Sequence, residues 1–175
     1  AGDFKRQLAE ELPEVDHRPF YLGHPGMKYT QMPARDGTAH GNIVRSNRWP
    51  NCSFFTHWTQ LGDSITWKVE VPEDGSFRVS LYYTCPAGDE GSLLELSVGN
   101  SRLRARIAEA HDPPLVGMEE DLAPRVESYV KDWHVAELGN MDLASGEALM
   151  SLKALEIPGN SVMDFRLLMF EKILP

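Results

Sequence analysis

Residues 64–83 read SITWKVEVPEDGSFRVSLYY, and this stretch decides the fold. Apolar and polar side chains alternate in two runs, with apolar side chains at Ile65, Trp67, Val69 and Val71 and again at Phe77, Val79, Leu81 and Tyr83. A period of two indicates strands with one face in a core and the other in water. The PEDG segment between them has proline early and glycine late, as in a tight turn. The two strands are therefore predicted to pair as a hairpin.

The alternating pattern continues on both sides of this stretch. LLELSV (93–98) is predicted to pair with SRLRARI (101–107) across Gly99-Asn100, and FFTHW (54–58) with residues 64–71 across a turn at 60–63. Further strands are predicted in SYVKDWHVAEL (128–138), GNMDL (139–143), EALMSLKAL (147–155) and VMDFRLLMFEKI (162–173). About nine or ten short strands indicate an all-β antiparallel β-sandwich or barrel. The lack of amphipathic helices between the strands excludes a doubly wound α/β fold.

The N-terminal residues follow a different pattern. In DFKRQLAEELPE (3–14), Phe4, Leu8 and Leu12 share one helical face and Pro13 blocks continuation, which predicts a short helix. Residues 1–28 are therefore predicted to be a helix and linker, and residues 29–175 a single β-sandwich domain. A chain of 175 residues fits this organisation. It begins with Ala and has no apolar leader, which leaves its compartment open.

Composition excludes several classes of function. The formal net charge of −9 disfavours binding to nucleic acids and to anionic membranes, since both attract basic proteins. No apolar run approaches the roughly 18 residues of a membrane span. Cys52 and Cys85 are too few for a disulfide scaffold. The predicted pairing of residues 54–58 with 64–71 places them at opposite ends of a sheet, so both are predicted to be free thiols.

Charge is unevenly distributed along the chain. Residues 28–49 contain four Lys or Arg and one Asp, a net of +3, whereas residues 109–132 contain seven acids and two bases, a net of −5. The acidic stretch overlaps a long irregular connection, residues 108–128, and such loops are usually functional or mobile. Its candidate calcium ligands are Glu109, His111, Asp112, Glu119, Glu120 and Asp121. A solvated loop closed by Asp112-Pro113-Pro114 is the favoured alternative.

Motifs for catalysis are missing from the sequence. It has no G-x-S-x-G elbow and no H-x-x-x-H metal pair, and no glycine-rich phosphate loop follows a strand. Aromatic rings can stack on sugar faces, which makes Trp49 and Trp58 candidates for glycan binding. Trp67 belongs to the core by alternation, and packing is the alternative for the other two.

Several strings occur in an order that resembles a known family. They are PARDGTAHGNIVRS (33–46), PNCSFFTHWTQLGDSITWKVEV (50–71), YYTCPAGDEGSLLELSVGNSRL (82–103), EAHDPPL (109–115), ESYVKDW (127–133) and LKALEIPGNSVMD (152–164). Together they resemble the C-terminal region of bacterial arylsulfatase A-like enzymes, often named N-acetylgalactosamine-6-sulfatases. More distantly, the chain resembles galactose-binding-like jelly rolls and carbohydrate-binding modules. The formylglycine motif Cys/Ser-x-Pro-Ser/Ala-Arg of sulfatase catalysis is absent.

The resemblance implies a non-catalytic accessory domain of jelly-roll type that packs on a sulfatase catalytic domain and binds glycan. It also implies a secreted or periplasmic location. In such jelly rolls a structural Ca²⁺ often lies at the sandwich edge, and the matching positions are Asp164 and, near the first strand, Asp36. The alternatives are a structural interaction module without ligand, a stand-alone carbohydrate-binding module, and a hydrolase with an unrecognised site.

The basic segment is the candidate contact for an anionic glycan. Its expected ligands are Arg35, His40, Arg45, Arg48 and Trp49, because guanidinium groups donate paired hydrogen bonds to sulfate or carboxylate oxygens. The alternative is that these arginines pair with acids of the same domain or of an adjoining one.

Overall fold

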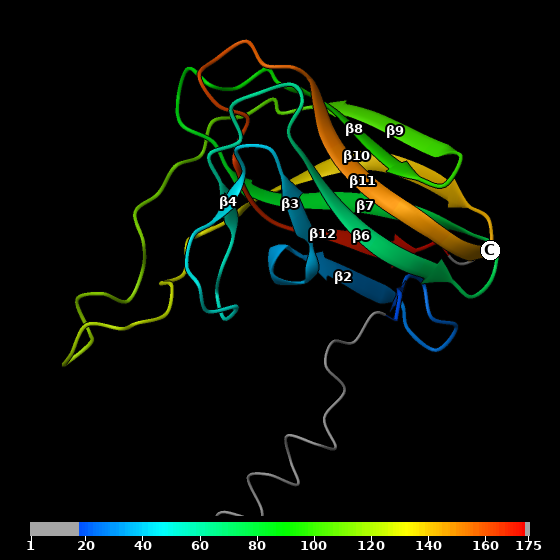
Figure 1. Ribbon diagram of the computed structural model, residues 1–175, viewed down its shortest axis with the longest axis horizontal. Coiled ribbons are helices and arrows are strands. Elements are labelled where there is room, and N and C mark those ends of the chain that lie inside the picture. The colour runs from blue at the N-terminus through cyan, green and yellow to red at the C-terminus, as the bar shows by residue number, and fades with distance from the viewer. Residues whose placement is uncertain (1–17, 174–175) are drawn as a thin grey trace, which may run out of the picture.

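The computed structural model describes residues 18–173, which form a sandwich of two β-sheets (Figure 1). The elements are β1 (Phe20–Tyr21), β2 (Tyr29–Pro33), η1 (Ala34–Asp36), β3 (Thr38–His40), β4 (Val44–Arg45), β5 (Phe55–Thr56), β6 (Ser64–Val71), β7 (Gly75–Thr84), β8 (Leu93–Val98), β9 (Ser101–Arg106), β10 (His134–Leu143), β11 (Gly146–Glu156) and β12 (Asp164–Lys172). The predicted all-β sandwich is confirmed. The predicted helix at 3–14 lies outside the described residues. Within residues 18–173, no helix is long and apolar enough to cross a membrane.

Within the described residues, each sheet has six strands. The first sheet has the order β1-β6-β11-β8-β9, with β3 also paired to β6; the second has the order β10-β7-β12-β5-β4, with β2 also paired to β12. Strand pairs are antiparallel except for β1 with β6, which is parallel. Strand β1 lies in the segment predicted as a linker, so part of that segment belongs to the first sheet.

The core lies between the two sheets, where the alternating apolar side chains of both meet. Trp67 of β6 packs on Phe165 of β12, with ring centroids 5.8 Å apart, and Phe77 of β7 packs on Phe170 of β12 at 6.3 Å. All four side chains are buried. The alternation in residues 64–83 therefore predicted correctly which side chains enter the core.

The predicted hairpin of residues 64–71 with 76–83 is wrong. Strand β6 belongs to the first sheet and β7 to the second, so the PEDG segment crosses from one sheet to the other. The apolar faces of the two strands point toward each other across the core, and their backbones pair with other strands. Both arrangements bury the same side chains, which is why alternation did not distinguish them.

Other predicted pairings have mixed outcomes. The hairpin across Gly99-Asn100 is confirmed as β8 and β9. The hairpin of residues 54–58 with 64–71 is wrong, because β5 pairs with β4 and β12 in the opposite sheet. The two strands predicted in 128–138 and 139–143 are one strand, β10, which has a bulge near Gly139, and residues 128–133 belong to the preceding connection instead.

The acidic connection between β9 and β10 forms an arm that runs out from the sandwich and back (green to yellow in Figure 1). It contacts the segment before β5: the Asn47 side chain donates to the Val126 carbonyl at 2.8 Å, and the hydroxyls of Ser46 and Ser128 are 3.1 Å apart. Its returning limb is fixed by the Trp133 ring, which packs edge-on against Phe54 at 5.3 Å. The arm thereby brings the acidic and basic stretches of the sequence side by side.

Candidate functional site

Four loops meet at one end of the sandwich and enclose a hollow of about 440 Å³. They are the connections that follow β5, β7, β9 and β11, and β12 begins at the hollow. The lining residues are Thr56, His57, Thr59, Pro86, Asp112, Lys131, Asn160, Ser161, Met163 and Asp164. Most of the lining residues have polar side chains, which supply hydroxyl, amide, imidazole, carboxylate and ammonium groups, although apolar atoms form the larger part of the exposed lining.

Lys131, on the returning limb of the arm, joins the groups that line the hollow. Its ammonium lies 2.7 Å from Asp164 Oδ2 and 3.6 Å from Asp112 Oδ1, and it donates to Thr84 Oγ1 at 3.1 Å. The Lys131 and Asp164 side chains are 12% and 22% exposed, so water screens this pair only partly. The ammonium also lies 5.2 Å from the centre of the Phe54 ring. One charged side chain thus connects the arm to β7 and β12.

The loop before β12 is held in place by a buried carboxylate. Asp89 accepts from the Asn160 backbone N–H and from the Ser161 hydroxyl, each at 2.7 Å, and these bonds lower the pKa of Asp89 below its usual value. Gly159 permits this close approach: a Cβ there would lie 2.5 Å from Asp89 Cα and 2.9 Å from the Gly88 carbonyl oxygen. Asp89 therefore positions two lining residues without lining the hollow itself.

His57 and Trp58 diverge at the end of β5. His57 has a φ of +60°, which is uncommon for a residue other than glycine, and its side chain is exposed at the hollow. Trp58 is only 1% exposed and lies in the core, so neither face of its ring is free to stack on a sugar in this structure. Trp58 is therefore a core packing residue, which is the alternative predicted for it from the sequence.

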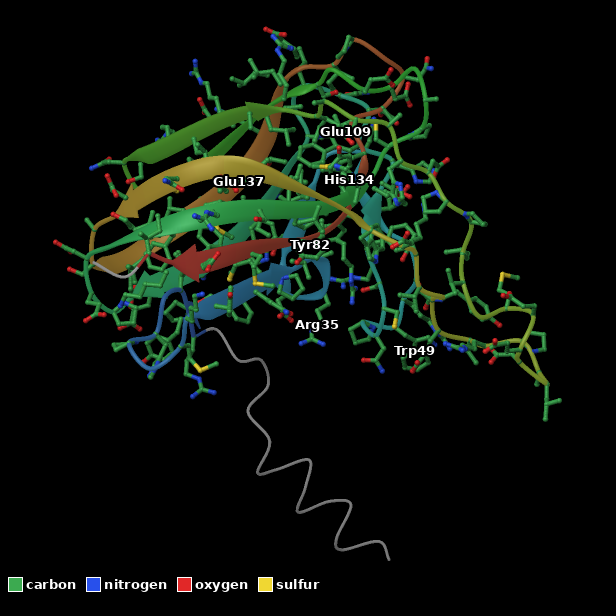
Figure 2. All side chains as sticks on the ribbon, turned by 180° about the vertical axis from the view of Figure 1, so that it is seen from behind. Arg35, Trp49, Tyr82, Glu109, His134 and Glu137 are labelled. Carbon is green, nitrogen blue, oxygen red and sulfur yellow. The ribbon has the colours of Figure 1, made fainter. Side chains whose placement is uncertain are left out.

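The residues of the basic segment do not form one group. Arg35 and Arg45 are in contact, since Arg45 Nη2 donates to the Arg35 carbonyl at 3.0 Å. Arg48 instead stacks over the Trp49 ring at 4.6 Å, and Trp49 is 42% exposed. His40 belongs to the first sheet, where its Nε2 lies 2.8 Å from Thr66 Oγ1. Figure 2 shows Arg35 and Trp49 on the side of the molecule that also presents Tyr82.

The candidate calcium ligands Asp36 and Asp164 belong to different segments. Asp164 begins β12 and pairs with Thr84 of β7, whereas Asp36 ends η1, which follows β2. Each carboxylate has a cationic partner, Lys131 for Asp164 and Arg35 for Asp36. Both carboxylates are therefore paired with a cationic side chain in this structure. Within residues 18–173, no cluster of three or more His, Cys, Asp or Glu side chains could hold a metal ion.

The acidic residues of the arm are also dispersed. Asp112 lies at the hollow, His111 contacts Asp132, and Asp121 pairs with Arg125 at 2.6 Å. Glu119 and Glu120 are exposed near the tip. This arrangement corresponds to the solvated loop that was the favoured alternative.

The buried thiol and phenol near the hollow are poorly suited to nucleophilic chemistry. Burial raises the pKa of Cys85 to about 11, and neighbouring acids add to the effect. Burial likewise raises the pKa of Tyr83 to about 12. Both groups stay protonated near neutral pH, and only a thiolate is a strong nucleophile. Cys52 and Cys85 are both free thiols.

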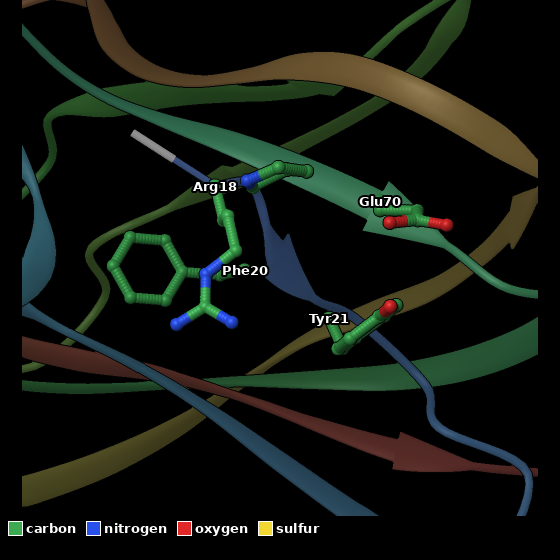
Figure 3. A pocket seen from close by; sticks show the side chains of 5 residues that line it. Arg18, Phe20, Tyr21 and Glu70 are labelled. Carbon is green, nitrogen blue, oxygen red and sulfur yellow. The ribbon is translucent and has the colours of Figure 1, made fainter. Parts of the chain in front are cut away.

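A second hollow, of about 470 Å³, lies beside β1 (Figure 3). Its lining consists of Arg18, Pro19, Phe20, Tyr21 and Glu70. Phe20 and Tyr21 expose large parts of their rings there. It lies where the described part of the chain begins, and we assign it no ligand.

Sequence reasoning identified Asp112 and Asp164 of the hollow at the loop end but missed its other lining residues. Asn160 and Ser161 lie in an irregular segment, where no periodicity marks a residue, and Lys131 lies in residues 128–133, which are predicted as strand but belong to the arm. The proline and glycine of residues 158–159 indicated a loop but gave no indication of what it approaches. The β-bridge between Cys85 and His111 brings the β7–β8 loop and the arm together.

Comparisons with known proteins identify similar folds but no similar sequences. No protein-family model matches the sequence, and no curated protein matches it. A family 35 carbohydrate-binding module from Clostridium thermocellum matches with a TM-score of 0.54 at 14% identity, over 83% of this chain and 99% of the module. A carbohydrate-binding module (CBM6cm-2) of Cellvibrio mixtus lichenase 5A matches with a TM-score of 0.54 at 14% identity, over 85% of this chain and 100% of the module.

A third similar structure is the Cry4Aa toxin of Bacillus thuringiensis. It matches with a TM-score of 0.59 at 13% identity, over 84% of this chain, but the chain spans only 24% of the toxin's length. At such identities a likeness shows the fold alone. The chain is thus a jelly-roll β-sandwich of the kind found in carbohydrate-binding modules, and the comparisons show no link to sulfatases.

Proposed function

We propose that this chain is a non-catalytic carbohydrate-binding module and that it binds glycan in the hollow at the loop end. The observation that carries the proposal is the lining of that hollow. Lys131 and Asn160 supply N–H donors, Asp112 and Asp164 supply carboxylate acceptors, and several hydroxyl groups can do either. A sugar hydroxyl both donates and accepts, so a wall of mixed donors and acceptors suits it. The volume of about 440 Å³ lies within the usual range for small-ligand sites, roughly 300–1,000 Å³.

The similar structures support the same class of function. One is a family 35 carbohydrate-binding module, and the module of Cellvibrio mixtus lichenase 5A was solved in complex with cellotriose. Both are matched over nearly their whole length, so the similarity covers the complete module. The high pKa of Cys85 makes this thiol a poor nucleophile, which favours a binding role for the hollow rather than a catalytic one.

Binding of neutral oligosaccharides to the purified protein tests this proposal. Isothermal titration with cello-, manno- and xylo-oligosaccharides should find at least one ligand. Asn160→Ala and Thr59→Ala should each weaken its binding by about tenfold, the equivalent of one lost hydrogen bond of about 1.4 kcal/mol. Asn100→Ala, at the turn between β8 and β9 at the opposite end of the sandwich, is the control and should bind like the parent. Equal binding by all variants would place the glycan elsewhere.

The second candidate is a structural interaction module. It is favoured by the arm, on which Val116, Met118, Leu122 and Val126 expose apolar side chains. An adjoining sulfatase catalytic domain would be one partner, and this link rests on the sequence resemblance, as does a secreted or periplasmic location. If no glycan binds across a broad oligosaccharide array, the structural role replaces the proposed one.

A structural Ca²⁺ stays a prediction as well. Melting the protein with EDTA and with excess Ca²⁺ tests it: a rise in the melting temperature with Ca²⁺ would support the ion. Identical melting curves would remove it from the proposal.

A further inference from the structure

The second sheet forks beside β12. At its start β12 pairs with β5, through Phe165 and Phe55, and from Leu167 onward it pairs with β2, beginning at Pro33. Arg166 lies between these two pairings. It is also the extra residue of a bulge, because Phe165 and Leu167 pair with the consecutive residues Tyr83 and Tyr82 of β7. A bulge redirects a side chain, and bulges are common next to functional sites.

The guanidinium groups of Arg45 and Arg166 meet at this fork, and that of Arg35 lies close enough to lower the pKa of Arg166. Arg166 Nη1 donates to the Ser53 carbonyl at 2.5 Å, and Arg45 Nη1 donates to the Ser53 hydroxyl at 3.1 Å. Arg45 also reaches the carbonyl of Arg35, which follows β2 in η1. Cys52, next to Ser53, has a φ of +54°, which is strained for a residue other than glycine. The local backbone is therefore held in a form that directs Ser53 toward both arginines.

Positive charge at the fork is not balanced by the protein. Arg35 has an ion pair, with its Nε 3.6 Å from Asp36. Across residues 18–173, neither Arg45 nor Arg166 forms an ion pair with a carboxylate, and their hydrogen bonds go to a hydroxyl and to carbonyls. Burial lowers the pKa of Arg166, and repulsion from Arg35 adds to this effect. Three cations and one anion leave a net charge of +2.

We propose that Arg35, Arg45 and Arg166 form a binding site for an oxyanion, a sulfate ester or a carboxylate, carried by a glycan. Each guanidinium carries five N–H donors, of which the protein uses one from Arg166 and two from Arg45, and the fork geometry of these donors matches paired oxygens. A bound oxyanion would relieve the repulsion between Arg35 and Arg166. Arg48 is not part of the site, because it stacks on Trp49.

The sheet beside the fork could carry the rest of such a ligand. Tyr82 on β7 lies opposite Leu167, the residue after Arg166, and alternates with the buried Leu81 and Tyr83. Tyr82 and Arg35 lie on the same side of the molecule in Figure 2. An aromatic ring next to an anion site can contact the apolar face of a sugar. The glycan as carrier rests on the proposed function, whereas the oxyanion site itself does not.

The first experiment tests the oxyanion site with inorganic sulfate. Thermal unfolding is followed while sulfate replaces chloride at constant ionic strength, for the parent and for Arg166→Gln, Arg35→Gln and Arg48→Gln. Sulfate stabilises proteins generally, so the comparison between variants decides. Sulfate should raise the melting temperature of the parent and of Arg48→Gln by more than that of Arg166→Gln and Arg35→Gln. An equal rise in the melting temperature of all four proteins would overturn the proposal. Arg35→Gln keeps the test valid if Arg166→Gln fails to fold, because Arg35 is an exposed side chain.

The second experiment identifies the source of the oxyanion. Titration uses κ-carrageenan oligosaccharides (sulfate esters), neutral neoagaro-oligosaccharides and oligogalacturonides (carboxylates). At least one anionic ligand should bind, and Arg166→Gln should weaken it by about tenfold or more, while Arg48→Gln should change it by less than about twofold. Binding of the neutral ligand alone, unchanged in Arg166→Gln, would refute the site and leave the proposed function standing. A response to inorganic sulfate without binding of any glycan would support the site and refute the carrier.

Discussion

Replacing Lys131 by Met removes one charge from the hollow and keeps most of the side-chain stem. Asp164 and Asp112 then share a partly buried site without the ammonium that lies 2.7 Å and 3.6 Å from them in the parent. Exposed ion pairs contribute about 0–1 kcal/mol, whereas leaving a buried charge unpaired costs about 3–5 kcal/mol. Side-chain exposures of 12% and 22% place this pair between those limits. We therefore expect Lys131→Met to lower the free energy of unfolding by about 2 kcal/mol.

The assay is urea unfolding, supported by thermal unfolding, where about 2 kcal/mol corresponds to a fall of roughly 4–8 °C for a chain of this size. Asp164→Asn in the Lys131→Met background should recover part of the loss, because the unpaired charge is gone. The coupling in this double-mutant cycle should reach about 1 kcal/mol. Lys153→Met is the control: Lys153 pairs with Glu95 at 3.0 Å but is 46% exposed, and Arg104 also pairs with Glu95. That change should cost well under about 1 kcal/mol.

Two results would refute this reasoning. One is a Lys131→Met protein as stable as the parent; the other is strict additivity of the two substitutions. The same variant examines the calcium prediction, since it leaves Asp112 and Asp164 without a cation. A larger stabilisation by Ca²⁺ in Lys131→Met than in the parent would show that the ammonium occupies the place of a metal ion.

Three further predictions concern the surroundings of the hollow and catalysis. Asp89→Asn should lower stability by about 1–2 kcal/mol at neutral pH, because the carboxylate holds Asn160 and Ser161. The pKa of Asp89 is lower in the folded state than in the unfolded state, so the stabilisation is present above the unfolded pKa of about 4 and is lost as the pH falls through the folded value. In urea unfolding, the difference in free energy of unfolding between the parent and Asp89→Asn should therefore become smaller from about pH 7 to about pH 3. Gly159→Ala should lower the free energy of unfolding by about 1–3 kcal/mol and weaken glycan binding, because the added Cβ would collide with the backbone of Asp89. Urea unfolding measures the change, and a variant as stable as the parent would contradict that contact. Purified protein should show no arylsulfatase activity above background with a chromogenic sulfate ester, because the formylglycine motif is absent, and turnover that survives repurification would contradict the non-catalytic assignment.

Alternation of side chains predicted the fold class because burial of one strand face is a local property of sequence. It did not predict strand partners, which depend on where each strand packs. The PEDG segment illustrates the difference: a short turn can join neighbours in one sheet or cross to the facing sheet, and β6 and β7 do the latter. Gly139 predicts a break between two strands, whereas in the structure β10 continues past it through a bulge.

The candidate sites were predictable where a residue conflicts with its local pattern. Asp164 stands out in the sequence because it is a carboxylate in an apolar strand, and Arg35 and Arg45 stand out because basic residues cluster in an acidic chain. Arg166 fits the alternation of a half-exposed strand and lies over 100 residues after Arg45, so nothing local marked it. Lys131 lies in an irregular arm, and its role comes only from the approach of that arm to β12.

Charge distinguishes the two proposed sites, which lie on either side of the short segment from Ser53 to Thr56. The hollow has one cation and two anions, Lys131 against Asp112 and Asp164, a net of −1, so an anionic sugar would be repelled there. The fork has a net of +2 and favours the opposite kind of group. Thr56 lines the hollow, and Arg45 lies over the ring of its neighbour Phe55 at 5.3 Å, so adjacent residues of β5 contact the two sites. A glycan that carries both neutral and acidic residues and is long enough to reach both sites would therefore bind more tightly than a glycan of either residue type alone.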